Sequence, residues 1–122
     1  MYVLWGLFHI LAARNQFVRG QSLELGVVQG LIYQHAWNLL FFAVFSIIVG
    51  LWLNWKNDRL GYWLNLVVVS AADVGFVVFV LIPGHVPMVP GGVGPLLWIL
   101  AVGFSTLGIL SANRERAQQS AP

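Results

Sequence analysis

The sequence predicts an all-α integral membrane protein, a single bundle of four transmembrane helices with both termini in the cytoplasm. Three observations lead to this prediction. Of the 122 residues, 59% are hydrophobic and only 8% are charged, whereas soluble domains are about a quarter charged. The apolar residues gather in four segments separated by short polar or Pro/Gly-rich stretches. These segments lack the two-residue alternation of half-buried strands, and lengths of about 20 residues favour membrane-spanning helices.

The first span is expected at about residues 1–18. Its apolar part, Met1 to Ala13, is short, so we expect the polar end as far as Arg19 to reach the headgroups by snorkelling. A signal peptide is disfavoured, because no basic residues precede the apolar stretch. A start upstream of Met1 is the other explanation considered, and such an N-terminal extension would lengthen this span.

The other spans are expected at about residues 30–53, 62–82 and 95–112. The second and third reach the length of about 20 apolar residues that a helical span needs, and the fourth is near the lower limit. Pro95 suits the first turn of the fourth helix, and a start or bend is expected near Gly26 and Gly30. Residues 1–112 therefore form one transmembrane domain, and residues 113–122 are expected to form a disordered cytoplasmic tail.

The basic residues predict the orientation. Lys56, Arg59, Arg114 and Arg116 lie on one side of a four-span chain, whereas only Arg14 and Arg19 lie on the other. The positive-inside rule places the larger group in the cytoplasm, as in a multi-pass protein of the cell inner membrane. The basic residues are scattered, which argues against a nucleic-acid partner. No cysteine is present, which excludes disulfides, thiolate metal sites and cysteine nucleophiles.

Asp73 lies near the middle of the third predicted span. A carboxylate at that depth is costly, by about 2.5–3.5 kcal/mol on insertion scales, and intramembrane ionisable residues usually mark a functional site. At a rise of 1.5 Å per residue, His9 and His35 lie roughly 8 Å from the outer interface, Asn38 roughly 12 Å and Asp73 roughly 13 Å. We therefore expect these four side chains to meet in the outer half of the membrane.

The second predicted span carries polar side chains on one face, because Gln34 and His35 lie one helical turn from Asn38. We predict a polar pocket above an aromatic floor that binds a lipophilic small molecule. Asp73 and His35 are the candidates for acid–base catalysis, as a pair that could share a proton. The expected ligand-binding residues are Asn38, Gln34, His9, Phe41, Phe42, Phe45 and Phe76.

Other readings of the same residues stay open. The polar side chains, Asp73 included, could instead form interhelical hydrogen bonds that hold the helices together. His9 and His35 could ligate a haem. The chain could also be a non-catalytic membrane anchor or a quinone-binding subunit, as a homodimer or with a redox partner. His85 fits no metal-ligand spacing, so no metal site is predicted. Neither a cofactor nor a reaction can be identified from the residues.

Four short spans, the stretch WGLFH at Trp5 to His9 and the Pro/Gly-rich last loop at residues 83–95 resemble the DoxX-like group of small bacterial membrane proteins. The resemblance covers the layout of the whole chain. It implies a membrane subunit or small-molecule binder, often linked to redox or quinone chemistry. It assigns no functional residue in this sequence.

Overall fold

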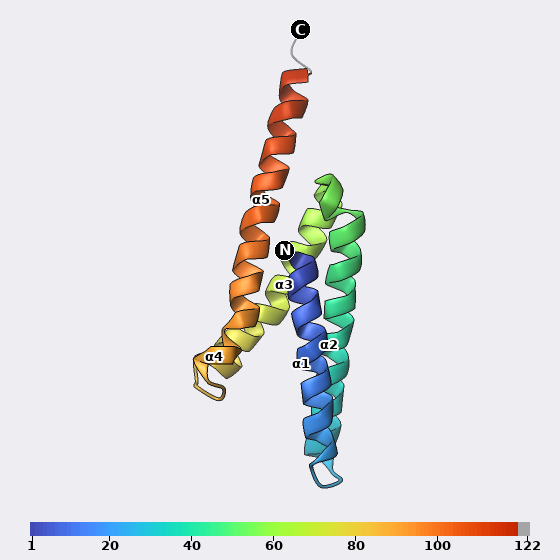
Figure 1. The fold of residues 1–122 in the computed structure, drawn as a ribbon, viewed down its shortest axis with the longest axis vertical. Coiled ribbons are helices and arrows are strands. Elements are labelled where there is room, and N and C mark those ends of the chain that lie inside the picture. Colours follow the sequence, from blue (N-terminus) through green and yellow to red (C-terminus); the bar gives the residue numbers. More distant parts are fainter. Residues whose placement is uncertain (120–122) are drawn as a thin grey trace.

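The computed structural model describes residues 1–119, and this part of the chain is helical without any strand. The long helices are α1 (Tyr2–Gln21), α2 (Val27–Trp52), α3 (Arg59–Phe76) and α5 (Val93–Gln119) (Figure 1). Three short elements join them: a 3-10 turn, η1 (Asn54–Lys56), a π-helix, η2 (Val77–Leu81), and α4 (Met88–Gly91). The prediction of an all-α fold is confirmed.

Three helical stretches are long and apolar enough to cross a membrane: Val27–Lys56, Arg59–Leu81 and Met88–Gln119. Within the most apolar window of each stretch only 17–22% of the residues are buried inside the protein. The remaining apolar side chains lie on the outside, and a surface of that extent is stable in lipid rather than in water. These helices indicate that the chain is a membrane protein.

α1 ends three residues beyond its predicted span of about residues 1–18. It continues as a helix through Arg14 and Arg19 to Gln21, because no Gly-Pro break or strong turn signal occurs before Ser22. Side chains then satisfy the carbonyl groups at its end. The Ser22 hydroxyl donates to the Arg19 carbonyl at 2.8 Å, and the Gln29 amide donates to the Gly20 carbonyl at 3.0 Å.

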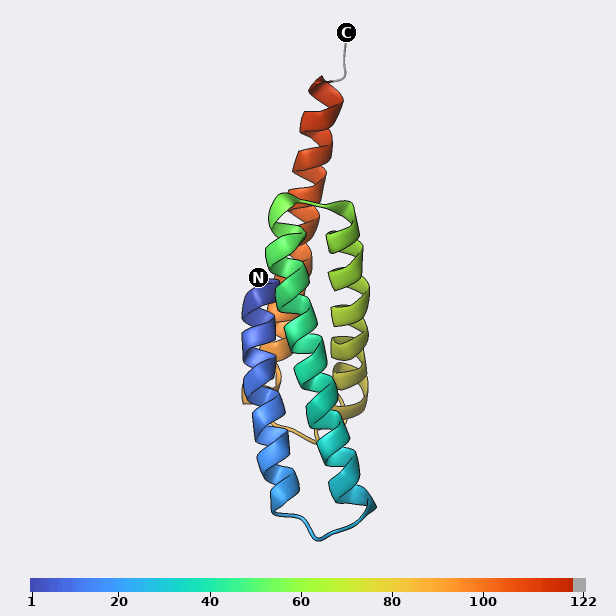
Figure 2. The ribbon, with the colours of Figure 1, turned by 90° about the vertical axis from the view of Figure 1, so that its right-hand side faces the viewer.

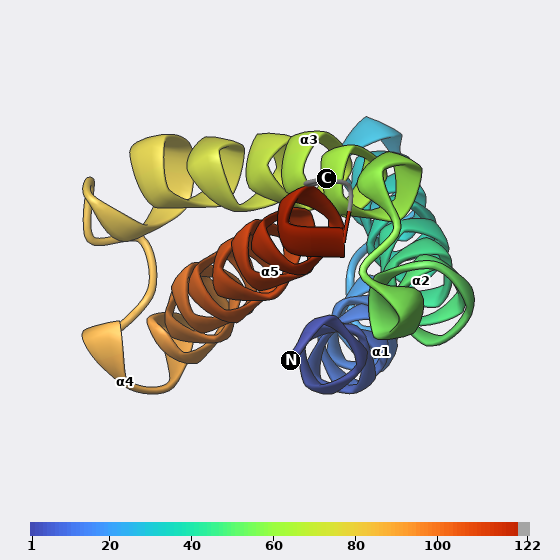
Figure 3. The same ribbon diagram turned by 90° about the horizontal axis from the view of Figure 1, so that it is seen from above.

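α1 and α2 form an antiparallel hairpin, whereas α3 and α5 lie beside it and diverge from it (Figures 1 and 2). Seen from above, α5 lies between α3 and α1 (Figure 3). The hairpin packs closely because residue 6 is glycine: a methyl group there would lie 2.7 Å from the Ala43 carbonyl oxygen. The N-terminal end of α1 lies beside Gly50, near the end of α2.

The core lies where α1, α3 and α5 meet. It consists of Tyr2 and Trp5 from α1, Val69 from α3 and Ala101 from α5, with Phe42 of α2 packed against them. α3 turns one face inward through residues spaced by four, namely Gly61, Asn65, Val69 and Asp73. Asp58 begins this helix by accepting hydrogen bonds from the backbone N–H groups of Leu60 and Gly61.

The C-terminal tail differs from the expectation of disorder over its first seven residues. Residues 113–119 continue α5, which extends past the turn between α2 and α3 (Figure 1). Their sequence, NRERAQQ, contains helix-favouring residues and neither Gly nor Pro. The Arg59 guanidinium donates to the Asn113 side chain at 3.1 Å and joins the start of α3 to this part of α5. The remainder of the predicted tail, residues 120–122, lies outside the described residues.

Candidate functional site

Asp73 is buried, and its partner is Trp5. The indole N–H of Trp5 donates to Asp73 Oδ2 at 2.7 Å, across the contact between α1 and α3. The two residues are 0% and 2% exposed respectively. Within residues 1–119 no second hydrogen bond reaches the Asp73 carboxyl group. The carboxyl group expected at the centre of the site is therefore held by an indole rather than by an imidazole.

His9 extends this arrangement towards α5. Its ring stacks on Trp5 with centroids 3.8 Å apart and an interplanar angle of 22°. His9 Nδ1 lies 2.9 Å from the Trp5 carbonyl oxygen, so that Nδ1 donates in the tautomer that makes this bond. Gly94 of α5 lies close to this ring, since a methyl group on Gly94 would be 3.1 Å from His9 Cε1. We call Asp73, Trp5 and His9 the Asp73 cluster.

His35 does not join the Asp73 cluster. It is exposed on α2, as are Gln34 and Asn38, and none of the three makes a hydrogen bond to another described residue. The expected meeting of Asp73 with His35 and Asn38 is therefore not seen. The face of α2 that contacts α1 and α3 carries small residues instead, Ala36, Ala43 and Ser46. Small residues allow close helix packing, and this arrangement directs the polar stripe outward.

His9 and His35 were expected at the same depth, but the register of α1 against α2 does not place them level with each other. Gly6 contacts Ala43 and Ile47, which places His9 level with about Phe42 on α2. His35 is about two helical turns away along α2, roughly 11 Å. The two imidazoles thus do not face each other, and the geometry gives no support to a bis-histidine haem site.

The aromatic side chains that were expected to form the floor of the pocket lie on different faces of the helices. Phe41 faces outward, whereas Phe42 packs against the core. Phe41 contacts both Phe42 and Phe45, with ring centroids 5.6 and 6.4 Å apart. Phe76 is half-buried at the end of α3. These side chains do not form one floor beneath a shared polar stripe.

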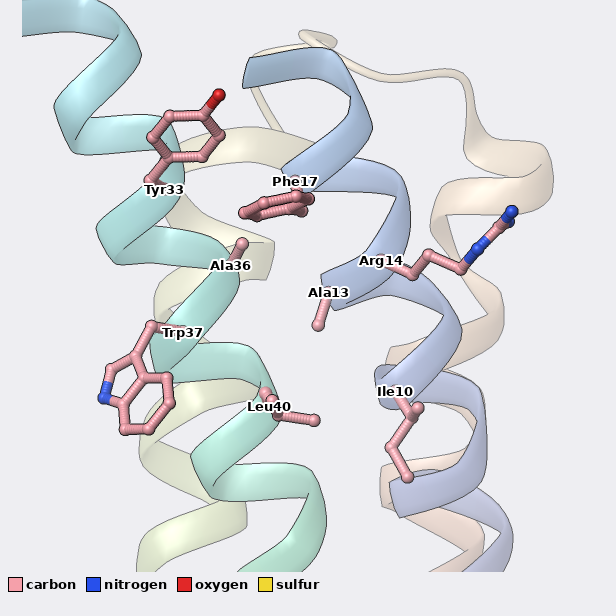
Figure 4. A pocket seen from close by; sticks show the side chains of 8 residues that line it. All are labelled: Ile10, Ala13, Arg14, Phe17, Tyr33, Ala36, Trp37 and Leu40. Atoms are coloured by element: carbon pink, nitrogen blue, oxygen red, sulfur yellow. The ribbon is translucent and has the colours of Figure 1, made fainter. Parts of the chain in front are cut away.

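A groove of about 460 Å³ lies instead between α1 and α2, nearer the loop that joins them (Figure 4). Its lining comes from both helices: Ile10, Ala13, Arg14, Phe17, Tyr33, Ala36, Trp37 and Leu40. We call it the α1–α2 groove. At the end of the groove nearer the loop, the ring centroids of Phe17 and Tyr33 are 5.0 Å apart. Tyr33 reaches α1 because residue 20 is glycine, where a methyl group would lie 2.6 Å from the Tyr33 ring.

The groove is almost entirely apolar, with two polar side chains at its loop half. The Tyr33 hydroxyl points towards the loop, and the Arg14 side chain extends away from α2 (Figure 4). Trp37 is 67% exposed and forms one flank. The arrangement can hold an apolar chain sideways from the membrane, with a polar end near Tyr33.

None of the eight groove residues was predicted to be a site residue. Two signals in the sequence bear on them: Tyr33 and Trp37 lie one turn apart on one face, and the small residues Ala13 and Ala36 mark close packing. These signals become a groove only when α1 and α2 are placed in register. That register depends on Gly6 and Gly20, and it could not be derived from spacing within either helix.

Interhelical hydrogen bonds account for most of the other polar side chains in the spans. Trp98 Nε1 donates to Ser70 at 2.9 Å, the Tyr62 and Thr106 hydroxyl groups are 3.2 Å apart, and Asn65 donates to the Ser46 carbonyl at 3.4 Å. Among residues 1–119, no group of three or more His, Asp or Glu side chains is placed to hold a metal ion.

No family model, no curated protein and no solved structure matches the chain.

Proposed function

We propose that the protein is a multi-pass protein of the cell inner membrane that binds a lipophilic small molecule in the α1–α2 groove. The groove itself supports this proposal. Its volume of about 460 Å³ is within the range of about 300–1,000 Å³ for small-molecule sites, which are mostly apolar with a few polar groups. The ligand's apolar chain lies along Ile10 and Leu40, and its polar end lies near the Tyr33 hydroxyl.

The proposal includes a four-helix bundle with both termini in the cytoplasm. α1 packs along α2 over nearly its whole length, so the two helices share one depth in the membrane (Figure 2). The turn between α2 and α3 and the end of α5 carry four basic residues, and the end near Arg14 and Arg19 carries two. In this orientation the groove lies in the outer half of the membrane.

Single cysteines test the orientation, because the chain has no native cysteine. Leu25 and Trp55 are both highly exposed and lie at opposite ends of the helices. We expect a membrane-impermeant maleimide to label Leu25→Cys in intact cells and to label Trp55→Cys only after the cells are opened. The reverse pattern, or labelling of both variants in intact cells, would contradict the proposed orientation.

Filling the groove tests ligand binding. Leu40→Trp places a large ring in the groove, whereas Leu100→Trp makes the same change on the lipid-facing side of α5, at nearly equal exposure (37% and 39%). We expect Leu40→Trp to weaken binding about tenfold, equivalent to 1.4 kcal/mol, and Leu100→Trp to bind like the unaltered protein. Binding is measured by native mass spectrometry of the co-purified lipophile and by titration with a quinone that carries a ten-carbon tail. Equal binding by both variants would contradict the groove as the site.

Catalysis by Asp73 with His35 is not part of this proposal, because the two side chains make no contact with each other. A role as a non-catalytic membrane subunit is the second candidate. The extension of α5 over residues 113–119 favours it, since this helix passes beyond the bundle (Figure 1). Native mass spectrometry separates the two roles: a small co-purifying mass supports ligand binding, and a co-purifying protein supports the subunit role.

A further inference from the structure

The outward face of α2 carries a continuous stripe that none of the other helices covers. Seen from above, α2 lies at the outer side of the helix arrangement, with α1 and α3 on its other sides (Figure 3). The stripe advances in alternating steps of three and four residues, and its members are exposed except for the half-buried Phe45. They are Leu31, Gln34, Asn38, Phe41, Phe45, Ile48 and Trp52. We call this stripe the α2 seam.

Two amides distinguish the α2 seam from the outward faces of the other helices. Gln34 and Asn38 lie about one helical turn apart on it, and neither makes a hydrogen bond to another residue within 1–119. The exposed positions of α1 as far as residue 11 carry no polar side chain. The same holds for the exposed positions between residues 60 and 79 and between residues 96 and 110. Amides that face lipid are therefore an exception in this fold.

Asn38 lies too deep for its short side chain to reach the lipid headgroups. It follows the start of α2 at Val27 by 11 residues, roughly 16 Å along a helix of 26 residues. The hydrocarbon of a bilayer is about 30 Å thick, so Asn38 lies within it. An amide without a partner is unfavourable there, and Asn and Gln side chains in membrane helices hydrogen-bond across to other helices. Because the protein's own helices offer no such partner, the seam calls for one from another molecule.

A second copy of this chain fits the chemistry of the seam. An amide both donates and accepts, so Asn38 can pair with Asn38 of an identical helix. Copies inserted in the same orientation are related by a two-fold axis along the membrane normal, which makes their α2 helices parallel and places each seam residue opposite itself. No charged side chain lies on the seam to select a charged partner.

The spacing of the seam fits such a pair as well. Steps of three and four residues are the pattern of two helices that cross in a left-handed sense, and one Asn in such a seam fixes the register. We propose that the protein forms a homodimer through the α2 seam, with Asn38 and Gln34 hydrogen-bonded across the two-fold axis. The interface is separate from the ligand in the α1–α2 groove, so either proposal can fail without the other.

Cysteine cross-linking in cell membranes tests the contact. The chain has no native cysteine, so the introduced thiol is its only one. Phe41→Cys lies on the seam, and Leu11→Cys is the control on α1. The two positions are 56% and 59% exposed, and they lie at similar depth because Gly6 of α1 contacts Ala43 and Ile47 of the antiparallel α2.

With copper phenanthroline, an oxidant that enters membranes, we expect Phe41→Cys to cross-link about tenfold faster than Leu11→Cys, because a disulfide needs Cα atoms within about 7 Å. The expected product has twice the mass of the chain. Equal rates for the two cysteines would overturn the proposal. So would a product of another mass, which would identify a different membrane protein as the occupant of the seam.

The role of the amide is tested with purified protein in phosphatidylcholine vesicles. Energy transfer between copies labelled at Trp55→Cys, measured over a series of protein-to-lipid ratios, gives the dimer dissociation constant. We expect Asn38→Leu to raise this constant about tenfold and Asn38→Gln, which keeps the amide, to raise it less. Asn15→Leu makes the same change at an exposed amide on α1 and should leave the constant unaltered. An unaltered constant in Asn38→Leu, or an equal rise in Asn15→Leu, would contradict pairing through Asn38.

Discussion

Replacing Trp5 with phenylalanine is expected to lower the free energy of unfolding by about 3 kcal/mol. Two losses add up to this value. The indole N–H that donates to Asp73 at 2.7 Å disappears, which leaves the buried carboxyl group without a partner. The smaller ring also leaves unfilled space in the core beside Val69 and Ala101, where Trp5 is fully buried. Unfolding in mixed micelles with increasing denaturing detergent measures the change.

Asp73→Asn provides the comparison. The amide oxygen can still accept the Trp5 hydrogen bond, so we expect a loss of no more than about 1 kcal/mol. Binding in the α1–α2 groove should persist, because Asp73 does not line it. A double-mutant cycle of Trp5→Phe with Asp73→Leu isolates the pair, and we expect a coupling energy of about 1.5 kcal/mol. A coupling energy near zero would show that the Trp5–Asp73 bond does not hold α1 against α3.

Replacing Gly6 with alanine is expected to lower the free energy of unfolding by about 2–3 kcal/mol. The added methyl group would lie 2.5 Å from Ile47 Cγ1, 2.7 Å from the Ala43 carbonyl oxygen and 2.9 Å from Ser46 Oγ. One of these contacts is with backbone, which cannot move aside by rotation. α1 must therefore shift away from α2, and the α1–α2 groove should widen with it.

Gly103→Ala is the matched control on α5, where a methyl group would have no neighbour within 4 Å. We expect its free energy of unfolding to remain within about 0.5 kcal/mol of the unaltered protein. The same unfolding measurement serves both variants, and groove binding by Gly6→Ala should fall. Equal stability of the two variants would show that α1 and α2 are not as close at Gly6 as the structure places them.

The composition and the lengths of the apolar segments were enough to predict helices, because a chain in lipid must satisfy its backbone hydrogen bonds within each segment. They failed at the end of α5. Asn113 was taken as the start of disorder, but polar residues with adequate helix propensity continue α5 to Gln119. Asp58 does mark the start of α3, because its side chain accepts hydrogen bonds from the first backbone N–H groups of that helix.

The sequence by itself determined that the chain is helical, that it belongs in a membrane, and that Asp73 lies in the middle of a span where it needs a partner. Only the tertiary structure decided that this partner is Trp5, that His35 and Asn38 face outward, and that a groove forms between α1 and α2. The reason is physical. Membrane insertion depends on the composition of each segment separately, whereas partners across helices depend on rotation and register. Close contacts at single glycines such as Gly6 and Gly20 set the rotation and the register of the helices. These contacts cannot be predicted from the periodicity within one helix.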